Sequence, residues 1–87
     1  MAWSIELSEK AEKALAKLGS NAAIRIAKTL REVALLPDPR IRGEALTGNL
    51  AGYWRYRVGD WRIIVQCVDD RLVILVVAVG HRRKVYR

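Results

Sequence analysis

The alternation of apolar and polar residues is clearest at residues 53–68, where two runs rich in β-branched and aromatic residues flank Gly59-Asp60. A two-residue connection with glycine first is typical of a type II′ hairpin turn, which fixes the register of both strands. The predicted register pairs Arg57 with Arg62. Because side chains alternate between the two faces, one face is predicted to be apolar and to consist of Trp54, Tyr56, Val58, Trp61, Ile63, Val65 and Cys67.

The other face of this hairpin carries three arginines, Arg55, Arg57 and Arg62. Two of them are predicted to lie directly opposite each other on neighbouring strands. Like charges in such a pair cost about 0.2–1 kcal/mol instead of contributing that much. A hairpin that accepts this cost is expected to hold an anion on its arginine face.

The N-terminal third has the pattern of one strand followed by two helices. Residues 2–7 alternate as a half-buried strand does, and Ser8 is a suitable N-cap for a helix that ends at Gly19. Ser20 is predicted to cap a second helix, which Pro37 prevents from continuing. The expected buried sides are Ala11, Ala14, Leu15 and Leu18 on the first helix and Ala23, Ile26, Ala27, Leu30, Val33 and Ala34 on the second.

The segment between the second helix and the hairpin, residues 37–52, is rich in Pro, Gly, Asp and Asn and is predicted to be a long ordered loop. Leu46 and Leu50 are expected to attach this loop to the core. The whole pattern predicts an α+β fold in a single domain, residues 1–87. It has an N-terminal strand, a two-helix hairpin and then an antiparallel three-stranded meander, with the helices packed on one sheet face.

A third strand of the meander is predicted at residues 71–79, after a tight turn at residues 69–70. If this turn also has two residues, Arg62 lies opposite Val77, and the basic segment 81–87 leaves the sheet beside the arginine face. One face of the strand is then apolar, although the helices can cover only the opposite face, so another chain is expected to close part of it. That apolar face carries Val73, Leu75, Val77 and Val79.

Composition and charge narrow the possible partners. The 87 residues are 52% hydrophobic, which favours a globular fold, and 16 basic against 9 acidic residues give a net charge of +7. Ten of the basic but only four of the acidic residues lie in residues 40–87, a bias typical of binding to nucleic acid, to an acidic protein or, as the weakest alternative, to an anionic membrane surface. The sequence has no secretory signal, no apolar run long enough to span a membrane, and one cysteine, Cys67, which is predicted to be a core residue. A cytoplasmic protein is therefore expected.

The candidate chemistry lies where the basic C-terminal segment meets the hairpin arginines. No cluster of cysteine and histidine and no glycine-rich phosphate loop is present, so neither a metal nor a cofactor is expected. His81, Arg82 and Tyr86 join the arginines, a set that suits cleavage of RNA through its own 2′-hydroxyl. Binding of an acidic partner without catalysis is the alternative reading of the same residues.

Two stretches carry a resemblance to a known family. L-T-G-N-L-A-G-Y-W-R-Y-R-V-G-D-W-R-I-I-V-Q at 46–66 and D-D-R-L-V-I-L-V-V-A-V-G-H-R-R-K-V-Y-R at 69–87, with the strand–helix–helix start, resemble the RelE toxins of toxin–antitoxin pairs. The resemblance implies a ribosome-dependent mRNA endonuclease that enters the A site of the 30S subunit and cuts the codon there. It also implies a cognate RelB-like antitoxin that forms a hetero-oligomer with the toxin.

The resemblance also implies roles for individual residues. Arg57 and Tyr86 correspond to residues that activate the 2′-hydroxyl, and Arg82 to one that protonates the leaving 5′-oxygen. Because the guanidinium of Arg57 stays protonated, His81 is an alternative proton acceptor. The implied catalytic residues are Arg57, Arg62, Arg82 and Tyr86, and the implied phosphate-binding residues are Arg55, Arg57, Arg62, Arg83 and Lys84.

A second class of function shares this fold. ParE toxins inhibit DNA gyrase by binding it, and a non-catalytic binding module of the same fold is a further alternative. The presence of the arginines together with Tyr86 favours the nuclease.

Overall fold

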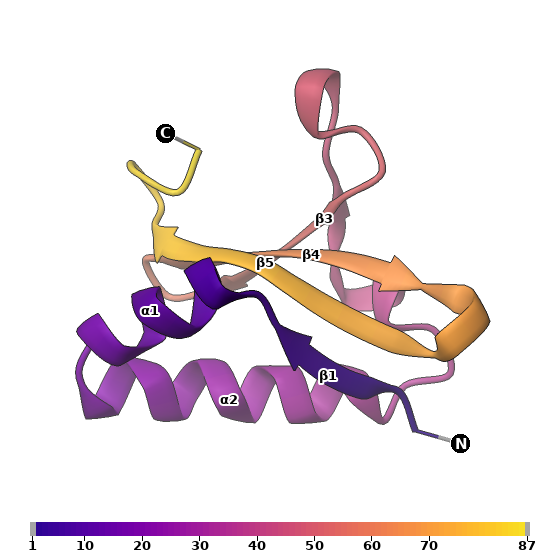
Figure 1. Ribbon diagram of the computed structural model, residues 1–87, viewed down its shortest axis with the longest axis horizontal. Helices are drawn as coiled ribbons and strands as arrows, with labels where there is room; N and C mark the ends of the chain where they lie inside the picture. The colour runs from indigo at the N-terminus through magenta and orange to yellow at the C-terminus, as the bar shows by residue number, and fades with distance from the viewer. Residues whose placement is uncertain (1, 87) are drawn as a thin grey trace.

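The computed structural model describes residues 2–86 and has the predicted order of elements (Figure 1). The elements are β1 (Ser4–Leu7), α1 (Glu9–Lys17), α2 (Ser20–Ala34), β2 (Glu44–Ala45), β3 (Trp54–Val58), β4 (Trp61–Val68) and β5 (Val73–His81). The strands form one sheet in the order β1-β5-β4-β3-β2, in which only the β1–β5 pair is parallel. The predicted α+β architecture is confirmed. Arg87, which belongs to the predicted basic tail, lies outside the described residues.

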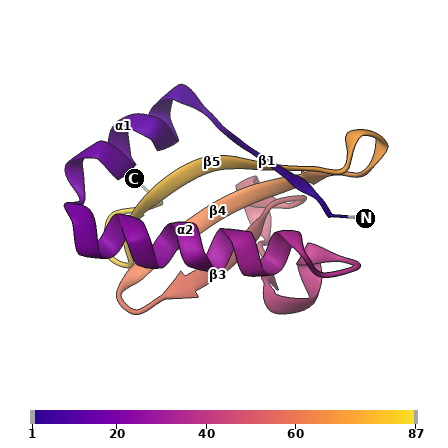
Figure 2. The same ribbon diagram turned by 90° about the horizontal axis from the view of Figure 1, so that it is seen from below.

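The core lies between the sheet and the two helices, which pack on the same sheet face (Figure 2). The predicted buried sides are confirmed for Ala11 of α1, which is fully buried, and for Ile26, Leu30, Val33 and Ala34 of α2. Ala14, Leu15 and Leu18 are partly buried against the core, whereas Ala23 and Ala27 are half-buried and lie outside the core cluster. Cys67 is half-buried against this core, and burial raises the pKa of its thiol. Among residues 2–86, no helix is long and apolar enough to cross a membrane.

Ser8 caps α1 as predicted and also ties the helix to the sheet. Its Oγ accepts a hydrogen bond from the backbone N–H of Ala11 at 3.1 Å and donates one to the carbonyl of Val77 at 3.2 Å. The prediction for Ser20 is wrong, because Gly19 is the N-cap of α2 with φ +86°, and no side chain caps that helix. Glycine adopts this left-handed backbone without steric cost.

The hairpin of β3 and β4 has the predicted register, with Val58 opposite Trp61 and Arg57 opposite Arg62. Gly59 has φ +59°, as the first position of a type II′ turn requires. The short strand β2 was not predicted. It lies within the stretch expected to be loop and pairs with β3, so that Glu44 lies opposite Arg55.

The predicted register between β4 and β5 is wrong by three residues, because Arg62 lies opposite Gly80 and not Val77. The connection between these strands has four residues, 69–72, instead of two, and Leu72 takes the left-handed conformation there with φ +51°. A β-bulge adds one more residue on β5, since Ile64 pairs with Ala78 but the next residue, Val65, pairs with Val76.

The bulge changes which side chains of β5 face the helices. Val79 was predicted on the open face, but it is buried in the core with Val76, while Ala78 lies on the open face beside Ile64. Ile64 and Ala78 are nonetheless buried, being 3% and 9% exposed. The chain itself covers them, through the loop of residues 46–53 and the C-terminal segment.

The loop before β3 is attached to the core by residues other than those predicted. Leu46 and Leu50 are only half-buried and lie outside the core cluster. Pro39 is fully buried instead, and its carbonyl accepts a hydrogen bond from the buried Tyr56 hydroxyl at 2.7 Å. Arg40 adds ion pairs to Asp38 at 3.1 Å and to Asp69 at 2.6 Å.

The two serines predicted as caps provide a test of this arrangement. We expect Ser8→Ala to lower the free energy of unfolding by about 0.5–2 kcal/mol, because an N-cap bond and the contact with the bulge are lost together. Ser20→Ala is the matched control and should change stability far less, since its hydroxyl caps nothing. Urea unfolding measures both, and equal effects of the two substitutions would contradict the assignment.

Candidate functional site

A groove of about 340 Å³ lies on the sheet face opposite the helices. Its floor is formed by β4 and β5, one wall by the loop of residues 46–53 and the other wall by the C-terminal segment. Figure 1 shows this loop and the C-terminal segment rising on the same side of the sheet. The groove is lined by Lys10, Asn49, Leu50, Tyr53, Ile64, Val77, Ala78, Val85 and Tyr86.

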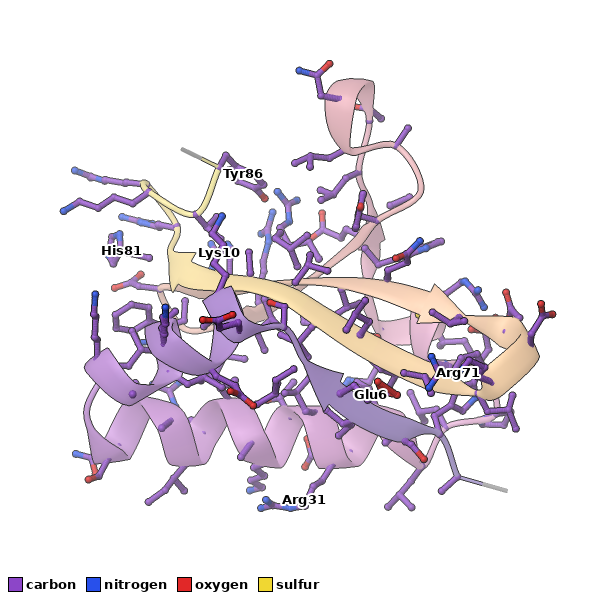
Figure 3. All side chains as sticks on the ribbon, in the orientation of Figure 1. Glu6, Lys10, Arg31, Arg71, His81 and Tyr86 are labelled. Carbon is purple, nitrogen blue, oxygen red and sulfur yellow. The ribbon has the colours of Figure 1, made fainter. Side chains whose placement is uncertain are left out.

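Backbone contacts hold the C-terminal segment against the end of the sheet. The N–H of Arg82 donates to the carbonyl of Asp60 at 2.8 Å, and the N–H of Val85 donates to the carbonyl of His81 at 3.0 Å. Gly80 permits this close packing, since a Cβ at that position would lie 3.3 Å from the Cα of Val85. Tyr86 is thereby directed over the sheet (Figure 3).

Four residues from three parts of the chain meet beside this groove. Arg55 donates through Nη1 to the hydroxyl oxygen of Tyr86 at 2.8 Å and through Nη2 to Oε2 of Glu44 at 2.9 Å. The other oxygen of Glu44, Oε1, lies 2.9 Å from Nε of Arg57. We call Glu44, Arg55, Arg57 and Tyr86 the inner cluster. The anion expected on the arginine face is, in this structure, the carboxylate of Glu44.

The two arginines of the inner cluster differ in their exposure. The side chain of Arg55 is 21% exposed and that of Arg57 is 57% exposed. The hydrogen bond with Tyr86 raises the pKa of Arg55, and the bond with Glu44 raises it further, while burial acts in the opposite direction. Nε of Arg55 is buried and has no hydrogen-bond partner among residues 2–86. Arg55 is therefore a permanently charged donor with one N–H still unsatisfied.

Arg62 and Arg82 lie at the hairpin turn and outside the groove lining. Nη1 of Arg62 donates to the carbonyls of Gly59 at 2.8 Å and Trp61 at 2.9 Å. Nε of Arg82 is 3.8 Å from the carboxylate of Asp60, a long contact between half-exposed groups. The two other predicted phosphate-binding residues, Arg83 and Lys84, are exposed on the C-terminal segment.

His81 lies apart from the inner cluster, although it was a candidate proton acceptor. It pairs with Trp61 across the sheet, and the two rings meet edge to face with centroids 5.8 Å apart. Both side chains line a second groove, beside Leu18, the C-cap of α1, on the helix side of the sheet. Its Nδ1 accepts a hydrogen bond from the N–H of Arg83 at 3.3 Å.

Glu44 is the residue of this site that the sequence analysis missed. A signal was present, because Glu44 is the only acidic residue from 39 to 59, a stretch with four arginines. As a half-exposed carboxylate between two guanidinium groups, it can accept a proton, which the arginines cannot. Within the described part of the chain, residues 2–86, no three side chains of His, Cys, Asp or Glu could hold a metal ion together.

Comparison with known proteins relates this chain to toxins. The family described as ParE toxin of type II toxin–antitoxin system, parDE, matches residues 5–86. The mRNA interferase toxin RelE of Escherichia coli is 34% identical over 85 residues, which cover 97% of this chain and 87% of that protein.

Two solved structures have a similar fold. The toxin–antitoxin complex RelBE2 from Mycobacterium tuberculosis matches with a TM-score of 0.84 at 20% identity, over 94% of this chain and 93% of that chain. A mutant of E. coli RelE in complex with an antitoxin RelBc peptide matches with a TM-score of 0.76 at 32% identity, over 93% and 84% of the two chains. The first of these likenesses supports the fold alone.

The position of Glu44 between two arginines leads to a testable expectation about anion binding. Glu44→Gln removes the charge that competes for Arg55 and Arg57, so the affinity for a non-cleavable single-stranded RNA should rise at low salt. The gain should be about twofold to fivefold, equivalent to the roughly 0.5–1 kcal/mol of an exposed ion pair.

The matched control is Glu12→Gln, which makes the same charge change on the exposed side of α1. Fluorescence anisotropy over a salt series measures both variants. If Glu44→Gln weakens binding, or if Glu12→Gln strengthens it equally, the carboxylate does not compete with the RNA for the arginines.

Proposed function

The chain belongs to the ParE toxin family of type II toxin–antitoxin systems, and we propose that it is a RelE-like toxin that cleaves mRNA in the A site of the 30S ribosomal subunit. The observation that carries this proposal is the inner cluster, in which two arginines hold the carboxylate of Glu44 beside the hydroxyl of Tyr86. The 34% identity to an mRNA interferase over nearly the whole chain supports the same reaction.

Cleavage of RNA through its own 2′-hydroxyl needs few protein groups. The 2′-oxygen attacks the phosphorus and loses its proton, the bond to the 5′-oxygen breaks, and that oxygen takes up a proton. The products are a 2′,3′-cyclic phosphate and a 5′-hydroxyl. The protein has to orient the strand, stabilise the additional negative charge on the phosphate oxygens and move two protons.

Arg55 and Arg57 are suited to stabilise the phosphate oxygens. Guanidinium groups match carboxylate and phosphate with the same paired donors, so a phosphate can take the position that Glu44 now holds between them. Arg62 and Arg82 provide further donors at the hairpin turn, for neighbouring phosphates of the strand. Arg83 and Lys84 add positive charge on the C-terminal segment.

The two proton transfers are assigned to Glu44 and Tyr86. Once a phosphate occupies the arginines, the carboxylate of Glu44 is free to accept the proton of the 2′-hydroxyl, a role that neither arginine can take. The oxygen of Tyr86 accepts a hydrogen bond from Arg55, so its own proton is available to the leaving 5′-oxygen. His81 has no part in this assignment, since it contacts Trp61 on the helix side.

We also propose that a RelB-like antitoxin binds and silences this protein in the cytoplasm, as part of a toxin–antitoxin hetero-oligomer. The two similar solved structures described above both contain an antitoxin or an antitoxin peptide. An acidic antitoxin segment can neutralise the arginines beside the groove, because residues 40–87 carry ten basic and four acidic residues. The catalytic steps described above use no cofactor.

A second candidate function is inhibition of DNA gyrase. The name of the matched family, ParE toxin, is the observation in its favour. A gyrase inhibitor needs a binding surface but no proton donor beside a phosphate site. The contact of Tyr86 with Arg55 therefore favours the nuclease.

Removing the Tyr86 hydroxyl tests the nuclease directly. We expect Tyr86→Phe to lower single-turnover cleavage of A-site mRNA on programmed ribosomes by at least about 10², since loss of one general acid costs about 10² to 10⁴ in rate. Ribosome affinity should change little, because the lost interaction acts in the transition state. Tyr53→Phe is the matched control, a second tyrosine of the same groove, and should cut at the wild-type rate.

Glu44→Gln should separate binding from chemistry in the same assay. We expect a fall in the single-turnover rate of about 10² or more, although RNA binding is tighter, because the amide cannot accept a proton. If this variant cuts at the wild-type rate, Glu44 is not the proton acceptor, and His81 is the next candidate to test. If the wild-type protein leaves A-site mRNA intact and blocks gyrase supercoiling, the gyrase inhibitor replaces the nuclease.

A further inference from the structure

A second basic patch lies at the outer edge of the hairpin, away from the groove. Figure 2 shows the turn between β3 and β4 beside the N-terminal half of α2. A hollow of about 330 Å³ opens between them, and three of its lining side chains carry positive charge. We call this hollow the edge patch. It is lined by Arg25, Lys28, Thr29, Glu32, Arg57, Val58 and Gly59.

The charges of the edge patch are not balanced within the protein. Across residues 2–86, neither Arg25 nor Lys28 has a carboxylate within 4.0 Å. The only acid of the patch, Glu32, is paired with Arg42 at 3.3 Å. The free donors of the patch therefore face solvent, and they suit an anion from outside.

Arg25 is an exposed residue whose guanidinium lies beside the hairpin turn. Its guanidinium lies against Gly59, since a Cβ at that position would be 3.1 Å from Nη2 and 3.3 Å from Nη1 of Arg25. Glycine is already required there by the φ of +59°. The same residue thus allows both the tight turn and the close approach of Arg25, which places a charged group at the turn.

From these contacts we propose that the edge patch binds a phosphate group of RNA, as a second site beside the inner cluster. Arg57 connects the two sites, because its Nε contacts Glu44 of the inner cluster while its side chain also lines the edge patch. Guanidinium, ammonium and the Thr29 hydroxyl are typical phosphate-binding groups, and the lining offers almost no apolar surface to a protein partner. This inference rests on the proposed function, since it assumes that the inner cluster takes RNA.

The phosphate can come from the strand that occupies the groove or from a different RNA. In either case a charge contact without base readout is expected, so the affinity should depend steeply on salt. For single strands, the slope of log affinity against log salt is about −0.7 for each phosphate contact.

The test uses Lys28→Gln and the double variant Arg25→Gln/Lys28→Gln, with Arg31→Gln as matched control. Arg31 is exposed on the same helix but lines a groove beside Ile5 and Leu7. Binding of a non-cleavable single-stranded RNA and of programmed ribosomes is measured over a salt series. We expect the double variant to flatten the slope by about 0.7, the value for the loss of one phosphate contact, and Lys28→Gln by part of that, while Arg31→Gln keeps the wild-type slope.

The cleavage rate at saturating protein should remain that of the wild type in all three variants, because none of the three residues contacts the reacting atoms. If the double variant has a flatter salt slope with free RNA, the phosphate belongs to the strand bound in the groove. If the slope is flatter only with ribosomes, the phosphate belongs to ribosomal RNA. Unchanged slopes with free RNA and with ribosomes would overturn the proposal. It would also be overturned if the variants bound an antitoxin more weakly but bound RNA and ribosomes as the wild type does. The binding assay does not depend on cleavage. A wild-type protein that binds RNA but does not cut it would therefore refute the proposed nuclease activity without refuting the phosphate site at the edge patch.

Discussion

The candidate site depends on the carboxylate of Glu44, which bridges two guanidinium groups on one strand. Arg55 and Arg57 are two residues apart on β3 and therefore point to the same face, where their charges repel. Pairing of β2 with β3 puts Glu44 opposite Arg55, and its two oxygens reach one arginine each at 2.9 Å. Exposed ion pairs contribute only about 0–1 kcal/mol, so the bridge orders both arginines and costs little to break, as the proposed exchange with a phosphate requires.

The part of the fold that could be predicted from the sequence is the part whose geometry is set by neighbouring residues. The Gly59-Asp60 turn closes two strands directly, and their register follows from the turn length. The register of β4 with β5 depends on the four-residue connection, in which Leu72 is left-handed, and also on a contact distant in sequence. The bulge at Val77 lies where Ser8 of the N-terminal segment binds the carbonyls of Val76 and Val77, a contact that no pattern within β5 encodes.

The same distinction explains which site residues could be predicted. Arg55 and Arg57 follow from strand alternation, but Glu44 faces them only because two residues of an apparent loop pair with β3. His81 was expected in a tail beside the arginines, whereas the longer connection and the bulge together keep it in the sheet, opposite Trp61, and the bulge turns it to the helix side. A shift of one residue moves a side chain to the other face of a strand, so this single irregularity separates His81 from the inner cluster.

Arg55 shows how the site and the stability of the C-terminal segment are connected. Its buried Nε has no partner, and an unsatisfied buried donor costs about 1–3 kcal/mol, a noticeable share of the roughly 5–15 kcal/mol by which small domains are stable. Two other donors of the same guanidinium offset this cost through Glu44 and Tyr86. Tyr86 therefore helps to fix the C-terminal segment to the sheet, in addition to its proposed role as a proton donor. An anion that takes Arg55 away from Glu44 leaves Tyr86 as the remaining side-chain partner. In the proposed mechanism this contact keeps the hydroxyl beside the phosphate when its proton is needed.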